Sequence, residues 1–229
     1  DKGRIWRIVP EKDEKPENPF VPPTSSQDLV NLLKDSNGWR RQIAQQGLVE
    51  SSDPKIADQL RELLKSSETP LCARVQAIWC LHGRNEVECR DITRSFNFSN
   101  ATERDQQVKL QMEMCEGRPK QFAMQAAARS SDPSVRFEAI LSCTHETQEA
   151  SQQQWTQVLT RLGRKDGRDS WFQDVLLVHS ENRPQDLFNV TSRVSPYNPG
   201  KLRSAPEHNK DDATFLFRIA QLVGRSGGG

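Results

Sequence analysis

Long apolar runs are absent from this sequence of 229 residues, and so is an excess of charge of either sign. No stretch approaches the roughly 20 consecutive apolar residues that a membrane-spanning helix needs, so we expect no membrane span. The 32 basic and 31 acidic residues leave a net charge of +1. A general surface for nucleic acid or anionic lipid would show a basic excess, and the charge balance therefore favours neither partner.

Signatures of catalytic sites are also missing. The sequence contains no Gly-x-Ser-x-Gly nucleophile elbow, no His-Glu-x-x-His metal pair and no Gly-x-x-x-x-Gly-Lys phosphate loop. The nearest thing to a carboxylate pair is Asp166 with Asp169, in a charged Lys-Asp-Gly-Arg-Asp stretch that is typical of a solvated turn. We therefore assign no catalytic, cofactor-binding or metal-binding residue, and we expect the chain itself not to be an enzyme.

A recurring helical pattern is what the sequence does contain. A basic residue is followed, in most copies, by small residues three and six positions later, and the four basic residues are Arg41, Arg74, Lys109 and Arg136. This spacing places the small side chains on roughly one helical face, where a neighbouring helix can approach closely. The intervals of 33, 35 and 27 residues between the basic positions are close to the roughly 30 to 45 residues of helix-pair repeats. The low apolar share of 34% also suits an extended stack with two solvated faces.

The periodicity predicts an all-α solenoid of about four to five helix pairs, preceded by a short extended segment. Residues 4–9 alternate like a strand, and a charged, proline-rich linker follows them. The expected helices lie near 25–34, 38–50, 70–82, 86–95, 103–116, 119–129, 133–145, 151–162 and 168–180, with a further amphipathic stripe from Ile56 to Leu64 and a last helix that holds Phe215, Phe217, Ile219, Leu222 and Val223.

Local start and stop signals support these helices. Ser-Ser-Asp-Pro occurs at 51–54 and again at 130–133, and in both copies the Asp can cap a helix whose first turn holds the Pro. Gly83 is expected to end the helix that begins at Pro70. An irregular insertion is expected after about residue 193, before the last helix.

Three segments carry a family resemblance. Residues 40–50 read Arg-Arg-Gln-Ile-Ala-Gln-Gln-Gly-Leu-Val-Glu, residues 73–83 read Ala-Arg-Val-Gln-Ala-Ile-Trp-Cys-Leu-His-Gly, and residues 132–140 read Asp-Pro-Ser-Val-Arg-Phe-Glu-Ala-Ile. All three resemble HEAT-type repeats of armadillo-like superhelices. Their order after Gly-Arg-Ile-Trp-Arg-Ile at 3–8 resembles the middle region of large planctomycete-type (PVC-type) haem-binding proteins, over most of residues 3–180.

In that family a sugar-dehydrogenase-like propeller ends in a similar strand, HEAT-like helices follow, and a c-type cytochrome domain comes last. The resemblance implies that residues 1–23 are the end of an upstream propeller-like domain plus a linker, that 24–224 form the helical repeat domain, and that 225–229 are a flexible tail. It also implies export to the periplasm. Because this chain has no Cys-x-x-Cys-His motif, the c-type haem is expected elsewhere in the parent protein.

The cysteines offer weak support for a metal site or a disulfide, because their number is odd and none forms Cys-x-x-Cys. Cys80 and Cys115 occupy the small-residue position of the repeated pattern, which favours a packing role. Cys80 with His82, and Cys143 with His145, form two Cys-x-His pairs. Residues two apart on a helix point roughly 200° apart, so neither pair is expected to converge on one ion. The five cysteines lie at positions 72, 80, 89, 115 and 143.

The repeated basic residues have two interpretations. Arg41, Arg74, Lys109 and Arg136 could face an acidic partner, or they could bond the adjacent repeat; we favour the second, because they share a stripe with small packing residues. Trp79 and Trp171 lie on or beside apolar stripes. Packing is their default role, and an exposed tryptophan would be a partner contact.

The sequence thus predicts a non-catalytic scaffold that contacts other proteins or neighbouring domains of its own chain. Under the resemblance it would lie between a dehydrogenase-like propeller and a cytochrome, within a protein that delivers electrons to haem. The alternative is a redox-, metal- or tetrapyrrole-binding enzyme segment that uses the Cys and His residues. A third hypothesis, nucleic-acid binding in a helical groove, has the charge balance against it.

Overall fold

The computed structural model describes residues 20–143, 149–167, 169–179, 184–191 and 209–226, and all regular secondary structure in these ranges is α-helical. The strand expected at 4–9 and most of the linker lie outside the described residues. The helices are α1 (Ser26–Leu32), α2 (Gly38–Glu50), α3 (Ile56–Lys65), α4 (Leu71–Gly83), α5 (Cys89–Ser95), α6 (Ala101–Met114), α7 (Gly117–Ala127), α8 (Pro133–Cys143), α9 (Glu149–Asp166), α10 (Ser170–His179), α11 (Pro184–Thr191) and α12 (Asn209–Ser226).

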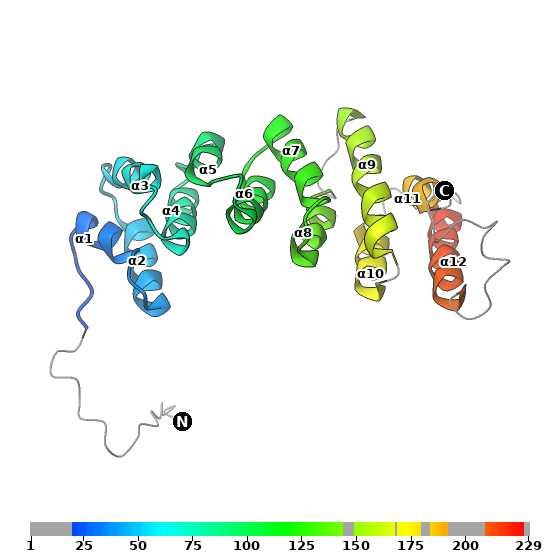
Figure 1. Ribbon diagram of the computed structural model, residues 1–229, viewed down its shortest axis with the longest axis horizontal. Helices are drawn as coiled ribbons and strands as arrows, with labels where there is room; N and C mark the ends of the chain where they lie inside the picture. The colour runs from blue at the N-terminus through cyan, green and yellow to red at the C-terminus, as the bar shows by residue number, and fades with distance from the viewer. Residues whose placement is uncertain (1–19, 144–148, 168, 180–183, 192–208, 227–229) are drawn as a thin grey trace, which may run out of the picture.

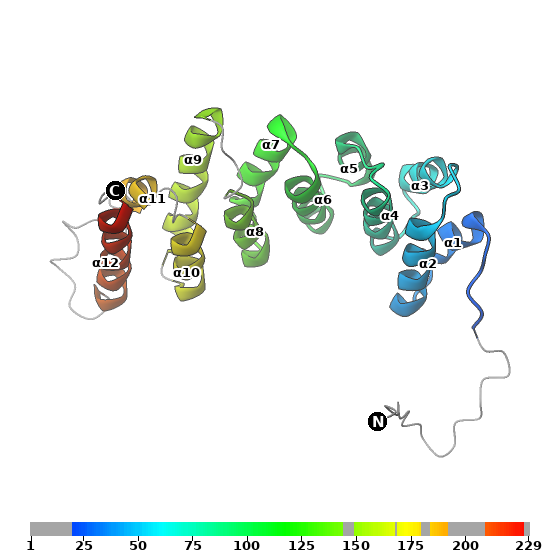
Figure 2. The same cartoon turned by 180° about the vertical axis from the view of Figure 1, so that it is seen from behind.

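The helices are stacked in two rows along the longest axis of the molecule. Both views show α3, α5, α7 and α9 along one edge, and α2, α4, α6, α8, α10 and α12 along the other (Figures 1 and 2). Even-numbered helices pack in succession from α2 to α12, and odd-numbered neighbours such as α1 and α3, or α7 and α9, also touch. Among the described residues, the main contacts of each helix are with near neighbours in the sequence, as expected for helical repeats.

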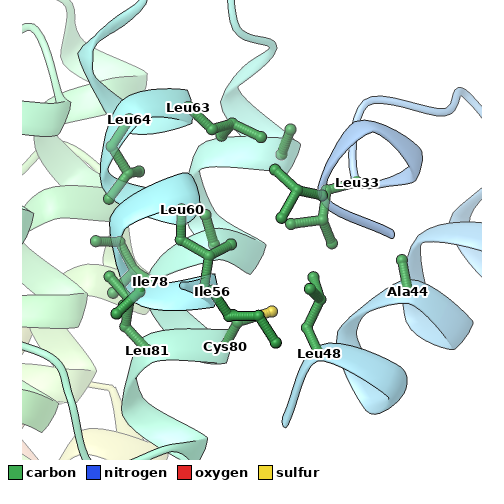
Figure 3. Packing of buried hydrophobic residues seen from close by; sticks show 14 of the residues in the cluster. Leu33, Ala44, Leu48, Ile56, Leu60, Leu63, Leu64, Ile78, Cys80 and Leu81 are labelled. Atoms are coloured by element: carbon green, nitrogen blue, oxygen red, sulfur yellow. The ribbon is translucent and has the colours of Figure 1, made fainter. Parts of the chain in front are cut away.

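The apolar side chains form two core clusters, one from Leu29 to Cys115 and the other from Val108 to Ile219. Figure 3 shows the first cluster where α3 and α4 meet α1 and α2, and Leu48, Ile56 and Cys80 are among its members. The clusters overlap along the chain in α6, which gives Leu110 to the first and Val108 to the second. Helix α6 is thus the seam between two halves of the stack.

Small residues mark the close approaches between helices, as the repeated pattern predicts. Ala44, Ala77 and Ala139 are completely buried. A Cβ atom added at Gly47 would lie 3.1 Å from Leu29 Cδ1, which is tighter than ordinary van der Waals contact. Glycine at this position therefore lets α1 lie close against α2.

The two Ser-Ser-Asp-Pro copies adopt the same hydrogen-bonded turn. In each copy the first Ser hydroxyl accepts the amide of the Asp, at 3.2 Å for Ser51 and 3.1 Å for Ser130. The Asp carboxylate then accepts the amide two residues further on, that of Lys55 or of Ser134. Asp132 directly precedes α8, whereas the first copy ends in an extra turn, so that α3 begins only at Ile56.

Helix α4 ends at Gly83, as predicted, but this glycine is not the left-handed capping residue. Gly83 is the last residue of the helix, and a Cβ atom there would lie 3.0 Å from Val49 Cγ2, so this glycine serves packing against α2. The left-handed position belongs to Asn85, at φ 57°. The amides of Asn85 and Glu86 donate to the carbonyls of His82 and Leu81, which closes the helix in a Schellman motif.

The number of helix pairs exceeds the predicted four to five, because the twelve helices within the described residues make six pairs. The additional helix is α11, a short segment that the sequence analysis left unassigned. It packs against both α9 and α12. Short helices of this kind owe their stability to such packing more than to their own sequence, which is why periodicity missed it.

Candidate functional site

Each of the four cations of the repeated pattern contacts a residue in the helix pair that follows its own. Each forms a side-chain contact with a residue 25 to 35 positions later in the chain. From donor to acceptor, these contacts are Arg41 to Gln76, Arg74 to Glu103, Lys109 to Ser134 and Arg136 to Asp166. The repeated pattern therefore places a brace between successive units of the stack.

The arginines of this set also bind the loop that precedes their own helix. Nη1 of Arg41 donates to the carbonyls of Asp35 and Ser36 at 2.8 and 2.9 Å. Nη1 of Arg136 donates in the same way to Ser130 and Ser131, at 3.0 and 2.9 Å. Only a guanidinium has enough donors in a fixed fork to hold a loop and the next unit together.

Arg74 binds both a carboxylate of the next unit and two backbone carbonyls. The residue is 8% exposed; Nη1 and Nη2 bind the two carboxylate oxygens of Glu103 at 2.8 and 2.9 Å. Further donors reach the carbonyls of Ser95 and Thr69 at 2.6 and 3.1 Å. The Arg74 hydrogen bonds, helped by the amide of Asn97, hold the pKa of the Glu103 carboxyl below its usual value of 4.5.

Asp166 was expected in a solvated turn, and this expectation was wrong. It ends α9 with a side chain only 9% exposed, and it receives both Nε and Nη2 of Arg136 at 2.7 and 2.6 Å. The same hydrogen bonds raise the pKa of Arg136 above its usual value. Asp169 instead accepts the amides of Trp171 and Phe172 at the start of α10. The two carboxylates therefore have separate structural roles.

Two further arginines, outside the pattern, brace neighbouring helices. Arg84 donates to the carbonyls of Leu48 and Ser51 at 2.9 and 2.5 Å, which joins the end of α4 to the end of α2. Arg61 on α3 pairs with Asp91 on α5 at 3.2 Å. Sequence reasoning missed both, because neither residue lies on the repeated stripe.

The cysteines divide into different environments. Cys89 and Cys115 form a disulfide with their Cα atoms 5.6 Å apart, which the sequence did not predict. Cys80 is buried, and burial raises the pKa of its thiol to about 12, so it stays protonated and unreactive. The side chain of Cys143, like His145, lies outside the described residues. Within the described ranges no three Cys, His, Asp or Glu side chains are placed to hold a metal ion.

Large apolar side chains are exposed mainly on the even-numbered row. Trp171 on α10 is 74% exposed, while Trp79 on α4 is 37% exposed and contacts the His82 ring edge-on at 5.6 Å. The other exposed side chains on this row are Trp39 on α2, Val178 on α10 and Phe217 on α12. Sequence reasoning placed the tryptophans beside the apolar stripes, and the structure turns Trp171 away from the core.

Two grooves lie between consecutive odd-numbered helices. The larger, of about 680 Å³, lies between α7 and α9 and includes three basic side chains, those of Arg129, Arg161 and Lys165. The smaller, of about 190 Å³, lies between α3 and α5 and includes four, those of Arg61, Lys65, Arg90 and Arg94. Sequence reasoning found neither groove, because the lining residues on opposite sides are 25 or more positions apart in the sequence.

Comparison with models of protein families, with curated proteins and with solved structures finds no match. None of the helices in the described ranges has the length and apolar character that spanning a bilayer requires. The inference of function therefore rests on the geometry of the chain itself.

Proposed function

We propose that this chain is a non-catalytic helical-repeat scaffold of the HEAT-like kind, which holds other protein modules through the surfaces of its stacked helices. The modules are neighbouring domains of its own polypeptide or separate partners. In the arrangement that the family resemblance implies, they are a dehydrogenase-like propeller and a c-type cytochrome, and the scaffold sets the distance between them. The chain itself needs no cofactor for this role.

The observation that carries the proposal is the exposed tryptophan of α10. Trp171 leaves 74% of its surface in solvent, on a helix whose Val178 is also largely exposed. Tryptophan is among the residues that contribute most to protein interfaces, and exposed apolar surface on a soluble domain marks such contacts. The inter-unit braces support the proposal, because they fix the spacing of the helices that present these side chains.

The disulfide supports the exported location that the resemblance implies. Cys89 and Cys115 are joined across the α5–α6 pair, and disulfides persist mainly in oxidising compartments such as the bacterial periplasm. An exported scaffold is consistent with a place beside c-type haem. The location remains part of the proposal.

The test is photo-crosslinking in the parent protein. A photoreactive phenylalanine analogue placed at Trp171 is expected to give one discrete adduct to a protein or to another domain, mapped by mass spectrometry. The matched control carries the analogue at Asp58, an exposed position on the odd-numbered row. Equal and diffuse crosslinking from both positions would remove the basis for the proposal.

A second measurement separates the scaffold from a metal- or tetrapyrrole-binding segment. The purified chain is analysed for bound metal and for haem absorbance, and its thiols are titrated without denaturant. Stoichiometric zinc or haem lost on substitution of Cys80 would overturn the scaffold proposal. A metal-free protein in which Cys80 reacts only after unfolding supports it.

A further inference from the structure

The groove between α7 and α9 has two walls with the same order of side chains. On α7 and its end, Gln125 is followed four residues later by Arg129. On α9, Gln157 is followed at the same interval by Arg161, and then by Lys165. Residues four apart lie one above the other on a helix. Each wall therefore presents an amide and then a cation, above a floor that includes Ala128 and Val158.

No acidic side chain is among the described residues that line this groove. Arg129 and Arg161 are exposed, and neither forms an ion pair within the described part of the chain. Lys165 donates to the carbonyl of Ser130 at 2.9 Å, which leaves its charge without a carboxylate. Three positive charges thus share a concave site without internal compensation.

In the groove between α3 and α5, by contrast, most of the cations form ion pairs with carboxylates of the chain. Its Arg61 is paired with Asp91 at 3.2 Å, Arg90 with Glu88 at 2.7 Å, and Lys65 with Glu62. The braces of the even-numbered row are likewise satisfied within the chain. Arg94 of that groove has no ion pair in the described part of the chain, whereas between α7 and α9 none of the three cations has one, and a ligand of negative charge would complete them.

The spacing of the cations suits an extended acidic peptide. Arg161 and Lys165 are separated along α9 by four residues, a rise of about 6 Å. Side chains on one face of an extended peptide repeat every two residues, about 6.6 to 6.8 Å. Two acidic residues at alternate positions would therefore meet the two cations in turn. The amide groups of Gln125 and Gln157 can bond the peptide backbone, and the volume of about 680 Å³ is within the range of ligand sites.

We propose that the groove between α7 and α9 binds an extended segment of a partner protein with acidic residues at alternate positions. This inference rests on the proposed function and deepens it, because it names a class of partner and a site separate from Trp171. Arg161 and Lys165 on α9 bind the carboxylates in turn, and Arg129 adds a third positive charge from the opposite wall.

The test uses the 229-residue chain and a fluorescein-labelled peptide of nine residues with Asp at every second position. Fluorescence anisotropy is expected to show saturable binding in about 50 mM NaCl that weakens in about 300 mM NaCl, as charge-charge contacts require. The same peptide with Asn for Asp is expected to bind at least about tenfold more weakly, a loss of roughly 1.4 kcal/mol.

A pair of charge-matched double variants tests the location. Arg129→Gln with Arg161→Gln is expected to weaken binding at least about tenfold, with an unchanged circular dichroism spectrum because both side chains are exposed. Lys34→Gln with Lys55→Gln removes the same two charges from exposed positions outside the groove, and is expected to change the affinity less than about twofold. Equal losses in the two variants, or equal binding of the Asp and Asn peptides, would overturn the proposal.

Inorganic pyrophosphate is the competing small anion. If it binds through Arg129 and Arg161 more tightly than the peptide does, the groove is a small-anion site and the proposal fails. If the peptide does not bind while Trp171 still crosslinks to a discrete protein, only the groove assignment is lost. If the peptide binds and the Trp171 adduct is absent, the tryptophan surface is wrong and the groove remains.

Discussion

At the scale of single residues, the basic position of the repeat joins successive units through a different acceptor each time. The acceptors opposite Arg41, Arg74 and Arg136 are an amide, a glutamate and an aspartate, respectively. Lys109 stands in the third copy, so the guanidinium is retained in three of the four copies while the acceptor changes in each. Where it occurs, the guanidinium bridges the preceding loop and the next unit at once.

Arg74 gives the sharpest residue-scale prediction. Arg74→Met leaves the Glu103 carboxylate and the carbonyls of Ser95 and Thr69 without their donor in a largely buried site. We expect the free energy of unfolding to fall by about 3 to 5 kcal/mol, the usual cost of breaking a buried pair. Urea denaturation followed by circular dichroism measures it.

The exposed Lys34 provides the control, because Lys34→Met removes the same charge and is expected to change stability by less than about 0.5 kcal/mol. Adding Glu103→Leu to Arg74→Met is expected to restore part of the loss, since no unpaired charge then remains. A loss below about 1 kcal/mol for Arg74→Met would mean that the brace contributes little to stability.

At the scale of the helices, turns formed by neighbouring residues could be predicted from the sequence, whereas contacts between residues distant in the chain could not. The Ser-Ser-Asp-Pro turns at 51–54 and 130–133 depend on neighbouring residues, and the sequence identified both turns, although only in the second copy does the Pro begin a helix. The partner of Asp166 lies 30 residues away and is visible only once α8 and α9 are packed. Gly83 shows a second limit, because a glycine near a helix end can serve either a left-handed cap or a close approach to another helix.

The disulfide gives the prediction at this scale. Cys89 and Cys115 close a separation of 26 residues around the α5–α6 pair, and loop-closure entropy for that length corresponds to about 3 to 4 kcal/mol. Reduction with a phosphine is expected to lower the free energy of unfolding by that amount. Denaturation in urea, with and without reductant, measures the difference.

The variant Cys89→Ala with Cys115→Ala controls for other effects of the reductant. Its stability is expected to be the same in both conditions, because Cys72 and Cys80 are free thiols. A reductant effect of the same size in the variant would assign the loss to something other than this bond.

At the scale of the whole molecule, the division of the core at α6 predicts that the two halves open separately. Leu60 is completely buried in the first cluster, and Leu60→Ala is expected to cost about 2 to 5 kcal/mol. Because repeat units are stabilised by near neighbours, amide exchange is expected to accelerate in α1 to α5 more than in α8 to α12. Hydrogen exchange read by mass spectrometry measures this distribution.

Leu162→Ala is the matched control in the other half of the stack, because Leu162 lies on α9 and is buried in the second cluster. It is expected to accelerate exchange in α8 to α12 more than in α1 to α5. Uniform acceleration along the chain in both variants would show that the stack unfolds as one cooperative unit.

The all-helical class and the packing of neighbours were predictable at this scale, because a repeated period along the chain implies repeated units in space. The seam at α6 was not, since Val108 and Leu110 are both ordinary core residues in sequence and differ only in which cluster they join. The groove between α7 and α9 was not predictable either, because its two walls come from helices that are distant in the sequence.

The crosslink between Cys89 and Cys115 has a mechanical consequence. A tether pulling on both ends of a stack lengthens it as units detach one after another, because each is held only by its neighbours. The stretch between Cys89 and Cys115 cannot be drawn out, because the disulfide joins its two ends over a separation of 26 residues. The maximum length of the pulled chain is therefore shorter by the roughly 90 Å that such a stretch spans when fully extended. Under load, the segment near the middle of the chain that the disulfide closes therefore does not extend.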